Sequence, residues 1–298
     1  MKLHVHHRTH HAYAAPVHDS FNEARLQPAD TELQSRLSFQ LHVLPAARLS
    51  QHLDFYLNCV HVIDVTAPHT ELVVETDAVI ATREAPALPA DATPAPCAAL
   101  AACARLPECY DFLRPSTYVD LAPATEALAH AVADGRTDVW QTILSLMTWV
   151  HREFTYLPAV THVHTPMQEA LRLRRGVCQD FAHVLIGLCR ALGVPARYVS
   201  GYLYNGPADR LKGTQATHAW VEVFIPGIGW RGLDPTNDQQ TNPRYVRIAA
   251  GRDYADVSPL RGTYRGTARR KLSVEVLVTR LDVDEAGAPP ALLVTPAS

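Results

Sequence analysis

The chain has 298 residues, of which 47% are hydrophobic and 19% are charged, a composition typical of a folded globular protein and not of a disordered chain or a coiled coil. Its length exceeds that of one typical domain and favours two. A formal net charge of −3 gives no electrostatic reason to expect nucleic acid or an anionic membrane as a partner, and we expect neither.

The start of the chain carries no apolar stretch of signal-peptide length, and no later window approaches about 18 uninterrupted apolar residues. These features predict a cytoplasmic protein. The six cysteines are too few for a disulfide scaffold, and they are expected to stay reduced in that compartment. A cysteine in a distinctive position is therefore a candidate for chemistry.

The first part of the chain, residues 1–84, is predicted to form a β-rich, sandwich-like domain. Runs that alternate or carry β-branched side chains span Leu37 to Val43, Val60 to Val65 and Glu71 to Thr82. Histidines crowd the N-terminus at His4, His6, His7, His10 and His11. His4 and His6 share a strand face, but no carboxylate or cysteine at ligand spacing completes a metal site, so we expect a surface or interdomain role and no metal.

Residues 85–110 are rich in alanine and proline and predict a linker. Three cysteines, Cys97, Cys103 and Cys109, follow one another at a spacing of six residues. That spacing matches no zinc motif, so we interpret them as structural.

The remaining residues, 111–298, are predicted to form a second domain in which helices pack on an antiparallel sheet, so the fold class is α+β. Helical spacing extends over 122–134, 138–154, 166–173 and, after Gly176, from Val177 or Cys178 to Leu192. Strands are predicted at Ala196–Tyr204, Thr217–Ile225, Gly229–Asp234, Tyr245–Ala249 and Lys271–Asp282, with a hairpin turn at 226–229.

Three residues at the ends of these elements have the chemistry of a thiol enzyme. Cys178 opens a helix, where unpaired backbone N–H groups and the helix dipole favour a thiolate. His218 opens a strand, and Asp234 ends the next strand of the same hairpin, within reach of the His218 ring. A nucleophile, a base and an acid that orients the base are the parts of a papain-like site.

The stretches GVCQDFAHVLIGLCRALGVPARYVSGYL and THAWVEVFIPGIGWRGLDPTND closely resemble the bacterial transglutaminase-like superfamily. The resemblance continues through GRDYADVSPLRGTYRG, and the opening HVHHRTHHAYAAPVHDSFNEARLQP is similar to the β-rich N-terminal domain that accompanies this core in bacteria. It implies a papain-like fold with Cys178 as nucleophile, His218 as base and Asp234 as orienting acid. It also implies that the loop after the strand containing Ile248 approaches these three residues.

Six further residues are weaker candidates for the site. Tyr156 is a candidate second donor to an oxyanion, beside the N–H of Cys178, although a partly buried aromatic residue in the core is an alternative. Gln179 and Asp180 either hold the site through hydrogen bonds or are solvated residues of the first helical turn. Arg252, Asp253 and Tyr254, with Asp256, either line the substrate or form a structural network.

These features predict a cysteine-dependent enzyme that acts on a peptide or protein amide bond through a thioester, with no cofactor and no metal. Transfer of the acyl group to water gives a peptidase or amidase, and transfer to an amine gives a protein-glutamine transglutaminase. A non-catalytic peptide-binding module is a third alternative, although such a module would not need all three residues of the triad.

Overall fold

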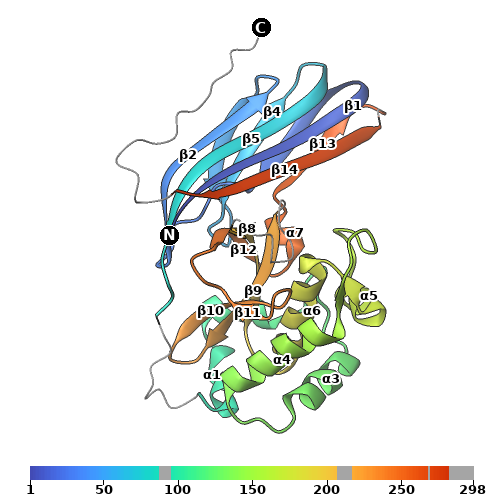
Figure 1. Cartoon of the computed structure of the whole chain (residues 1–298). Coiled ribbons are helices and arrows are strands. Elements are labelled where there is room, and N and C mark those ends of the chain that lie inside the picture. Colours follow the sequence, from blue (N-terminus) through green and yellow to red (C-terminus); the bar gives the residue numbers. More distant parts are fainter. Residues whose placement is uncertain (87–94, 207–216, 268, 282–298) are drawn as a thin grey trace.

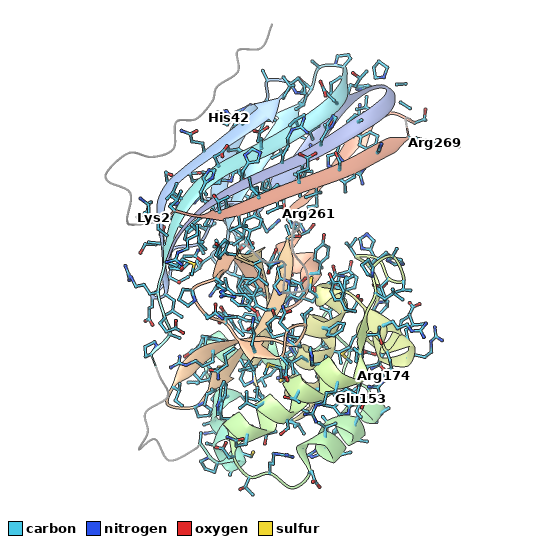
Figure 2. All side chains as sticks on the ribbon, viewed as in Figure 1. Lys2, His42, Glu153, Arg174, Arg261 and Arg269 are labelled. Carbon is cyan, nitrogen blue, oxygen red and sulfur yellow. The ribbon has the colours of Figure 1, made fainter. Side chains whose placement is uncertain are left out.

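The computed structural model describes residues 1–86, 95–206, 217–267 and 269–281. Two modules lie one above the other (Figure 1). We call residues 1–82 together with 260–280 the β module, and residues 95–257 the core module. Side chains fill the space between them (Figure 2). Lys2 and His42 are labelled on the β module, and Glu153 and Arg174 on the helical side of the core module.

The β module is organised by β1 (Lys2–Ala24), a strand of 23 residues that takes part in two groups of strands. Its first half pairs with β5 (His69–Thr82) and with β14 (Arg270–Arg280), and its second half pairs with β4 (Cys59–Val65) and with β13 (Leu260–Arg265). Register shifts between Ala12 and Val17 and between His18 and Phe21 separate the halves, as expected where a long strand bends. The other strands are β2 (Gln34–Leu44) beside β5 and β3 (Arg48–Leu53) beside β4. Each of β2, β3, β13 and β14 pairs with one strand and forms an edge.

The C-terminal strands differ from the predicted division of the chain. Residues 260–280 were expected in the second domain, but β13 and β14 both pair with β1 in the β module. The alternation of 271–282 predicted β14, whereas β13 was not predicted as a strand. Alternation also carries no information on which sheet a strand joins. Asp282, the predicted last residue of the final strand, lies outside the described residues.

Short helices occupy much of the predicted linker. Residues 97–113 form η1 (Cys97–Ala99), α1 (Leu100–Cys103), α2 (Pro107–Tyr110) and η2 (Asp111–Leu113). Cys103 and Cys109 are buried in the main hydrophobic core. The chain is therefore packed against the core module from residue 95 onward, where we expected a connecting segment up to residue 110.

The core module is built on a five-stranded antiparallel sheet with the order β11-β10-β9-β8-β12. Its strands are β8 (Ala196–Leu203), β9 (His218–Ile225), β10 (Gly229–Asp234), β11 (Gln239–Gln240) and β12 (Tyr245–Gly251). The short helix α7 (Tyr254–Val257) follows β12, and β6 (Thr155–Tyr156) pairs in parallel with β7 (Arg175–Gly176).

Helix α6 (Cys178–Ala191) is the central helix, because thirteen of its fourteen residues are buried. It packs on β8 and β9, and α3 (Pro123–Ala133), α4 (Val139–Glu153) and α5 (Met167–Leu173) surround it (Figure 1). A helix that is buried on all sides is enclosed by other elements, and this enclosure fixes where its first residue lies. Within the described residues, no helix is both long enough and apolar enough to cross a membrane.

The two modules share one hydrophobic core. Leu3 and Val5 of β1 belong to the same buried cluster as the side chains of α6. His7 is buried at the interface, where Nδ1 lies 2.8 Å from the Tyr202 hydroxyl and Nε2 lies 2.8 Å from Thr9 Oγ1. Burial, with a smaller effect of His6, lowers the pKa of His7 to about 4, so the ring is neutral near pH 7.

Candidate active site

Cys178 lies at the first position of α6, after Val177 in extended conformation. The carbonyl of Val177 accepts hydrogen bonds from the N–H groups of Asp180 and Phe181, which leaves the N–H groups of Cys178 and Gln179 without an intrahelical partner. Cys178 is 9% exposed, whereas Cys189 near the end of the same helix is fully buried. Cys178 therefore combines an unpaired helix terminus with limited access to solvent.

His218 and Asp234 form a buried pair on neighbouring strands. The register of β9 and β10, in which Leu233 pairs with Val221, brings the Asp234 carboxylate to the His218 ring. The distance from His218 Nε2 to Asp234 Oδ2 is 2.8 Å, and both side chains are inaccessible to solvent. The other ring nitrogen, Nδ1, is buried without a hydrogen-bond partner among the described residues. Cys178 is one of the groups that raise the pKa of the ring, so it lies nearby, and Nδ1 is the ring nitrogen available to its thiol.

The electrostatics of this pair favour an imidazolium. Burial alone lowers the pKa of His218, but the charge and hydrogen bond of Asp234, with a smaller effect of Cys178, raise it from 6.5 to about 10. Burial alone raises the pKa of Asp234, but the His218 charge and the hydrogen bonds to the carboxylate hold it below its usual value. Near pH 7 the carboxylate is therefore charged and stabilises positive charge on the ring.

Three residues that the sequence analysis did not select hold Asp234 in place. Oδ2 accepts hydrogen bonds from the Tyr245 hydroxyl and from Asn237 Nδ2, both at 2.7 Å, and Oδ1 accepts one from the N–H of Thr236 at 2.9 Å. The DPTN turn places Thr236 and Asn237 next to the carboxylate, and this local motif was available in the sequence. Tyr245 comes from β12, which is not a neighbour of β10 in the sheet order, so neither a local motif nor the sheet order indicates this contact.

Asp180 and Gln179 stabilise the chain around the nucleophile. Asp180 Oδ2 accepts hydrogen bonds from the Val177 N–H at 2.8 Å and from Thr161 Oγ1 at 2.7 Å, and Gln179 Nε2 donates to the carbonyl of Val163 at 2.9 Å. Both side chains are buried, at 1% and 7% exposure, so they are not the solvated first-turn residues of the alternative interpretation. They join the start of α6 to the loop before α5.

Tyr156 lies near Cys178 and belongs to the two-stranded β6–β7 pair that precedes α6. Its ring contacts Phe181, with the centroids 6.3 Å apart, so it is also a core aromatic residue. Burial, with smaller effects of the charges on Cys178, Asp180 and Asp234, raises the pKa of Tyr156 to about 12. The hydroxyl therefore stays protonated and is able to donate a hydrogen bond.

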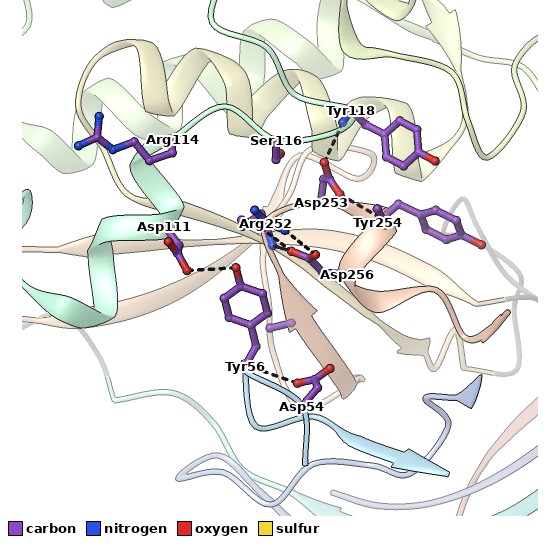
Figure 3. A network of polar contacts seen from close by, with 12 residues as sticks. Asp54, Tyr56, Asp111, Arg114, Ser116, Tyr118, Arg252, Asp253, Tyr254 and Asp256 are labelled. Carbon is purple, nitrogen blue, oxygen red and sulfur yellow. Dashed lines mark hydrogen bonds and ion pairs between the residues drawn. The ribbon is translucent and has the colours of Figure 1, made fainter. Parts of the chain in front are cut away.

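Arg252 and Asp253 belong to a polar network (Figure 3). Arg252 binds Asp256 through two guanidinium nitrogens at 2.9 and 3.0 Å. Asp253 is 1% exposed, caps α7 through the N–H of Ala255, and accepts a hydrogen bond from the N–H of Tyr118 at 2.7 Å. These contacts join α7 to the chain before α3 and leave the Asp253 carboxylate no access to a substrate.

Tyr254 contacts two buried ring side chains of the core module. Its N–H donates to His183 Nε2 at 3.2 Å, and its ring packs edge-on against Tyr198 at 6.4 Å. The pKa of Tyr198 is raised by burial and then by the charges of Cys178 and Tyr254, which indicates that both lie nearby. Tyr198 is thus another aromatic residue near the site that the sequence analysis did not select.

Trp220 and Tyr245 are among the residues that line a cavity of about 410 Å³, but Cys178 does not line it. It is therefore not the place where a substrate meets the thiol. No group of three possible metal ligands includes a residue of the triad within the described part of the chain, and the group that does exist is in the β module.

Comparisons with known proteins agree with this arrangement. The family described as "Transglutaminase-like superfamily" matches residues 126–235, and the "Bacterial transglutaminase-like N-terminal region" matches residues 3–81. An uncharacterized protein of Mycobacterium leprae is 34% identical over 94% of this chain and 99% of its own length. An uncharacterized protein of Mycobacterium tuberculosis is 35% identical over 94% of this chain and 93% of its own length.

Two further similarities concern proteins with a stated activity. A structure from Cytophaga hutchinsonii, described as that of a candidate cysteine protease, superposes with a TM-score of 0.71 at 25% identity and covers 95% of this chain and 92% of its own. A protein-glutamine gamma-glutamyltransferase of Pseudomonas aeruginosa is 30% identical over 160 residues, which are 48% of this chain and 23% of that protein. The chain belongs to the transglutaminase-like superfamily, with the bacterial N-terminal domain of that group and an α+β, papain-like core.

Proposed function

We propose that this protein is a cysteine-dependent acyl-transfer enzyme that hydrolyses amide bonds of a peptide or protein. The observation that carries the proposal is the buried His218–Asp234 pair next to a cysteine at the start of a buried helix. Thiol, imidazole and carboxylate are the three groups that nucleophilic catalysis by cysteine requires.

In the proposed reaction, the Cys178 thiolate attacks the carbonyl carbon and forms a tetrahedral oxyanion. The N–H of Cys178, and as a second donor the Tyr156 hydroxyl, stabilise the oxyanion, and His218 Nδ1 gives its proton to the departing amine. A thioester remains on Sγ. The neutral ring then takes a proton from water, the resulting hydroxide attacks the thioester, and the carboxylic acid leaves as the thiolate–imidazolium pair re-forms.

Asp234 is the orienting group in this scheme. It binds Nε2 at 2.8 Å, directs Nδ1 toward the thiol and stabilises the imidazolium. Because its carboxylate also accepts hydrogen bonds from Tyr245, Thr236 and Asn237, it cannot rotate away from the ring without losing them. The site is therefore organised before substrate binds.

The alternative acceptor is an amine, and the name of the Pseudomonas aeruginosa relative is the reason to test it. Water is present at far higher concentration than any amine and intercepts a thioester that is open to solvent, so we expect hydrolysis to exceed amine incorporation. Incubation with a peptide library, with and without a millimolar primary amine, followed by mass spectrometry, separates cleavage, deamidation and amine incorporation. Mainly amine-substituted products would identify a transglutaminase instead.

Labelling of the thiols distinguishes an enzyme from a non-catalytic binding module. In an enzyme, iodoacetamide should modify Cys178 faster than the other five cysteines near neutral pH, because the imidazolium of His218 stabilises the attacking thiolate. The Asp234→Asn protein is the matched control and should lose this preference. Equal labelling of Cys178 and a partly exposed cysteine such as Cys97 in the unmodified protein would favour a binding module.

A further inference from the structure

The outer face of the β module carries a cluster of histidine and carboxylate side chains from two neighbouring strands. His4 and His6 lie on the same face of β1, and Asp77, from β5, pairs with His6 in the strand register. Asp77 Oδ1 lies 3.2 Å from His4 Nε2 and 3.2 Å from His6 Nδ1. Glu75 Oε1, also from β5, lies 3.8 Å from His6 Nε2.

We propose that His6, Glu75 and Asp77 form a binding site for a divalent transition-metal ion such as Zn²⁺, with His4 beside it as a hydrogen-bond partner of Asp77. One ligand atom from each of the three ligand residues lies within 4.8 Å of the other two. A zinc ion bound to nitrogen and oxygen at its usual bond lengths holds tetrahedral ligands about 3.4 Å apart. The separation of 3.2 Å between His6 Nδ1 and Asp77 Oδ1 is close to this value. One imidazole offers one nitrogen to an ion, so Glu75 joins the set through the wider separation of up to 4.8 Å.

The donor set and its surroundings suit such an ion. A set of one imidazole and two carboxylates selects zinc and its neighbours over calcium and magnesium, which prefer oxygen alone. Two carboxylates also balance the charge of a divalent cation. Arg8 Nε lies 3.6 Å from Glu75 Oε2, the oxygen that does not face His6, so the cation of Arg8 orients the carboxylate and leaves Oε1 to the metal.

The scaffold is rigid, because β5 lies between β2 and β1, and β1 lies between β5 and β14 (Figure 1). The side chains of His4, His6, Glu75 and Asp77 are between 28% and 33% exposed, which gives an ion access from solvent. A metal here would link β1 to β5 across 71 residues of sequence and stabilise the β module. It lies outside the triad, so it would not take part in acyl transfer.

Zinc binding is tested by isothermal titration calorimetry and by the zinc-dependent rise in melting temperature. The parent and every variant in this test carry Cys178→Ser, because the Cys178 thiol together with His218 is itself a possible zinc site. His6→Ala and Asp77→Asn should each weaken zinc binding by about tenfold or more and remove most of the rise in melting temperature. Both positions are partly exposed on the outer face, so the metal-free variants should melt close to the parent.

His10→Ala is the matched control. His10 lies on the same strand and the same face, and its Nε2 is 3.1 Å from Glu71 Oε2 of β5, but no third ligand joins that pair among the described residues. This variant should bind zinc as the parent does, with one ion per chain. The proposal is overturned if the parent binds no zinc at micromolar concentration, if His6→Ala and Asp77→Asn bind it unchanged, or if His10→Ala weakens binding equally.

Discussion

Cys178 and Cys189 lie on the same helix and are chemically identical, yet only one of them faces a base. Cys189 is fully buried among apolar residues, and burial raises its pKa to about 12, so it remains a thiol. Position on α6 therefore separates the proposed nucleophile from a packing residue.

Cys178→Ala should abolish turnover and leave the fold intact, because it removes the attacking atom and changes little volume at a helix start. Cys189→Ala is the control and should cost about 1 kcal/mol of stability through a small cavity while activity is retained. Steady-state rates on the substrate found by the library screen, together with urea denaturation, test both. Residual activity of Cys178→Ala above about one-tenth of the parent would remove Cys178 from the mechanism.

Asp234→Asn should lower the rate by a factor of about 10³–10⁴, because an amide neither stabilises the imidazolium nor selects the correct tautomer. It should also change the pH dependence. The Asp234 carboxylate raises the pKa of His218 to about 10, so the imidazolium is lost only as the pH rises through that region. Without the carboxylate this pKa falls.

The alkaline limb of kcat/KM against pH should therefore lie well above pH 7 in the parent and move to lower pH in Asp234→Asn. The thiol and the ring titrate as a coupled pair, so the fitted values belong to the pair. An alkaline limb at the same pH in both proteins would contradict the role of Asp234.

At the scale of the elements, the start of α6 depends on a side chain three residues into the helix. Asp180 accepts hydrogen bonds from Val177 and Thr161 and is buried, so removing it leaves a buried N–H and a hydroxyl unpaired. Helix α4 begins in a simpler way, with Asp138 accepting a hydrogen bond from the N–H of Gln141 at 2.8 Å. The two aspartates cap helices, but only Asp180 is next to the nucleophile.

Asp180→Ala should destabilise the protein by about 1–3 kcal/mol and also slow turnover, because the N–H of Cys178 loses its fixed orientation. Asp138→Ala should cost about 1 kcal/mol and leave the rate unchanged. Urea denaturation and kcat measured well below the melting temperature separate the two effects. If Asp180→Ala lost stability alone, the cap would have no part in the chemistry.

At the scale of the whole molecule, β14 near the end of the described chain pairs with β1 at its start. β14 lies beside β1, and Val276, which pairs with His7, is 9% exposed and belongs to the core shared with α6. The next residue, Leu277, points to the opposite face and is 58% exposed. Adjacent residues of one strand thus lie in very different environments.

Val276→Asp should destabilise the protein by about 3 kcal/mol or more, because it puts an unpaired charge into the shared core. Leu277→Asp should change stability by no more than about 0.5 kcal/mol. Thermal and urea denaturation of the two variants give the comparison. Equal effects would mean that β14 does not pack on the core as described.

Much of the site was predictable from the sequence because its residues lie at the ends of strongly patterned elements. The helix from Cys178 and the strands that carry His218 and Asp234 follow from local periodicity and turn residues, and a single hairpin fixes how the two strands align. The resemblance to a known family, now confirmed, added the roles expected of the three residues.

Apart from the local contacts of Thr236 and Asn237 with Asp234, the contacts that the sequence did not predict join different elements. Tyr245 reaches Asp234 from β12, β14 joins β1, and Asp77 and Glu75 of β5 lie beside His4 and His6. Alternation identifies a strand and its buried face, but it does not select the partner strand, because many pairings would bury the same apolar side chains. The local pattern therefore determined the elements and the catalytic hairpin, and only packing in three dimensions decided which strands became neighbours.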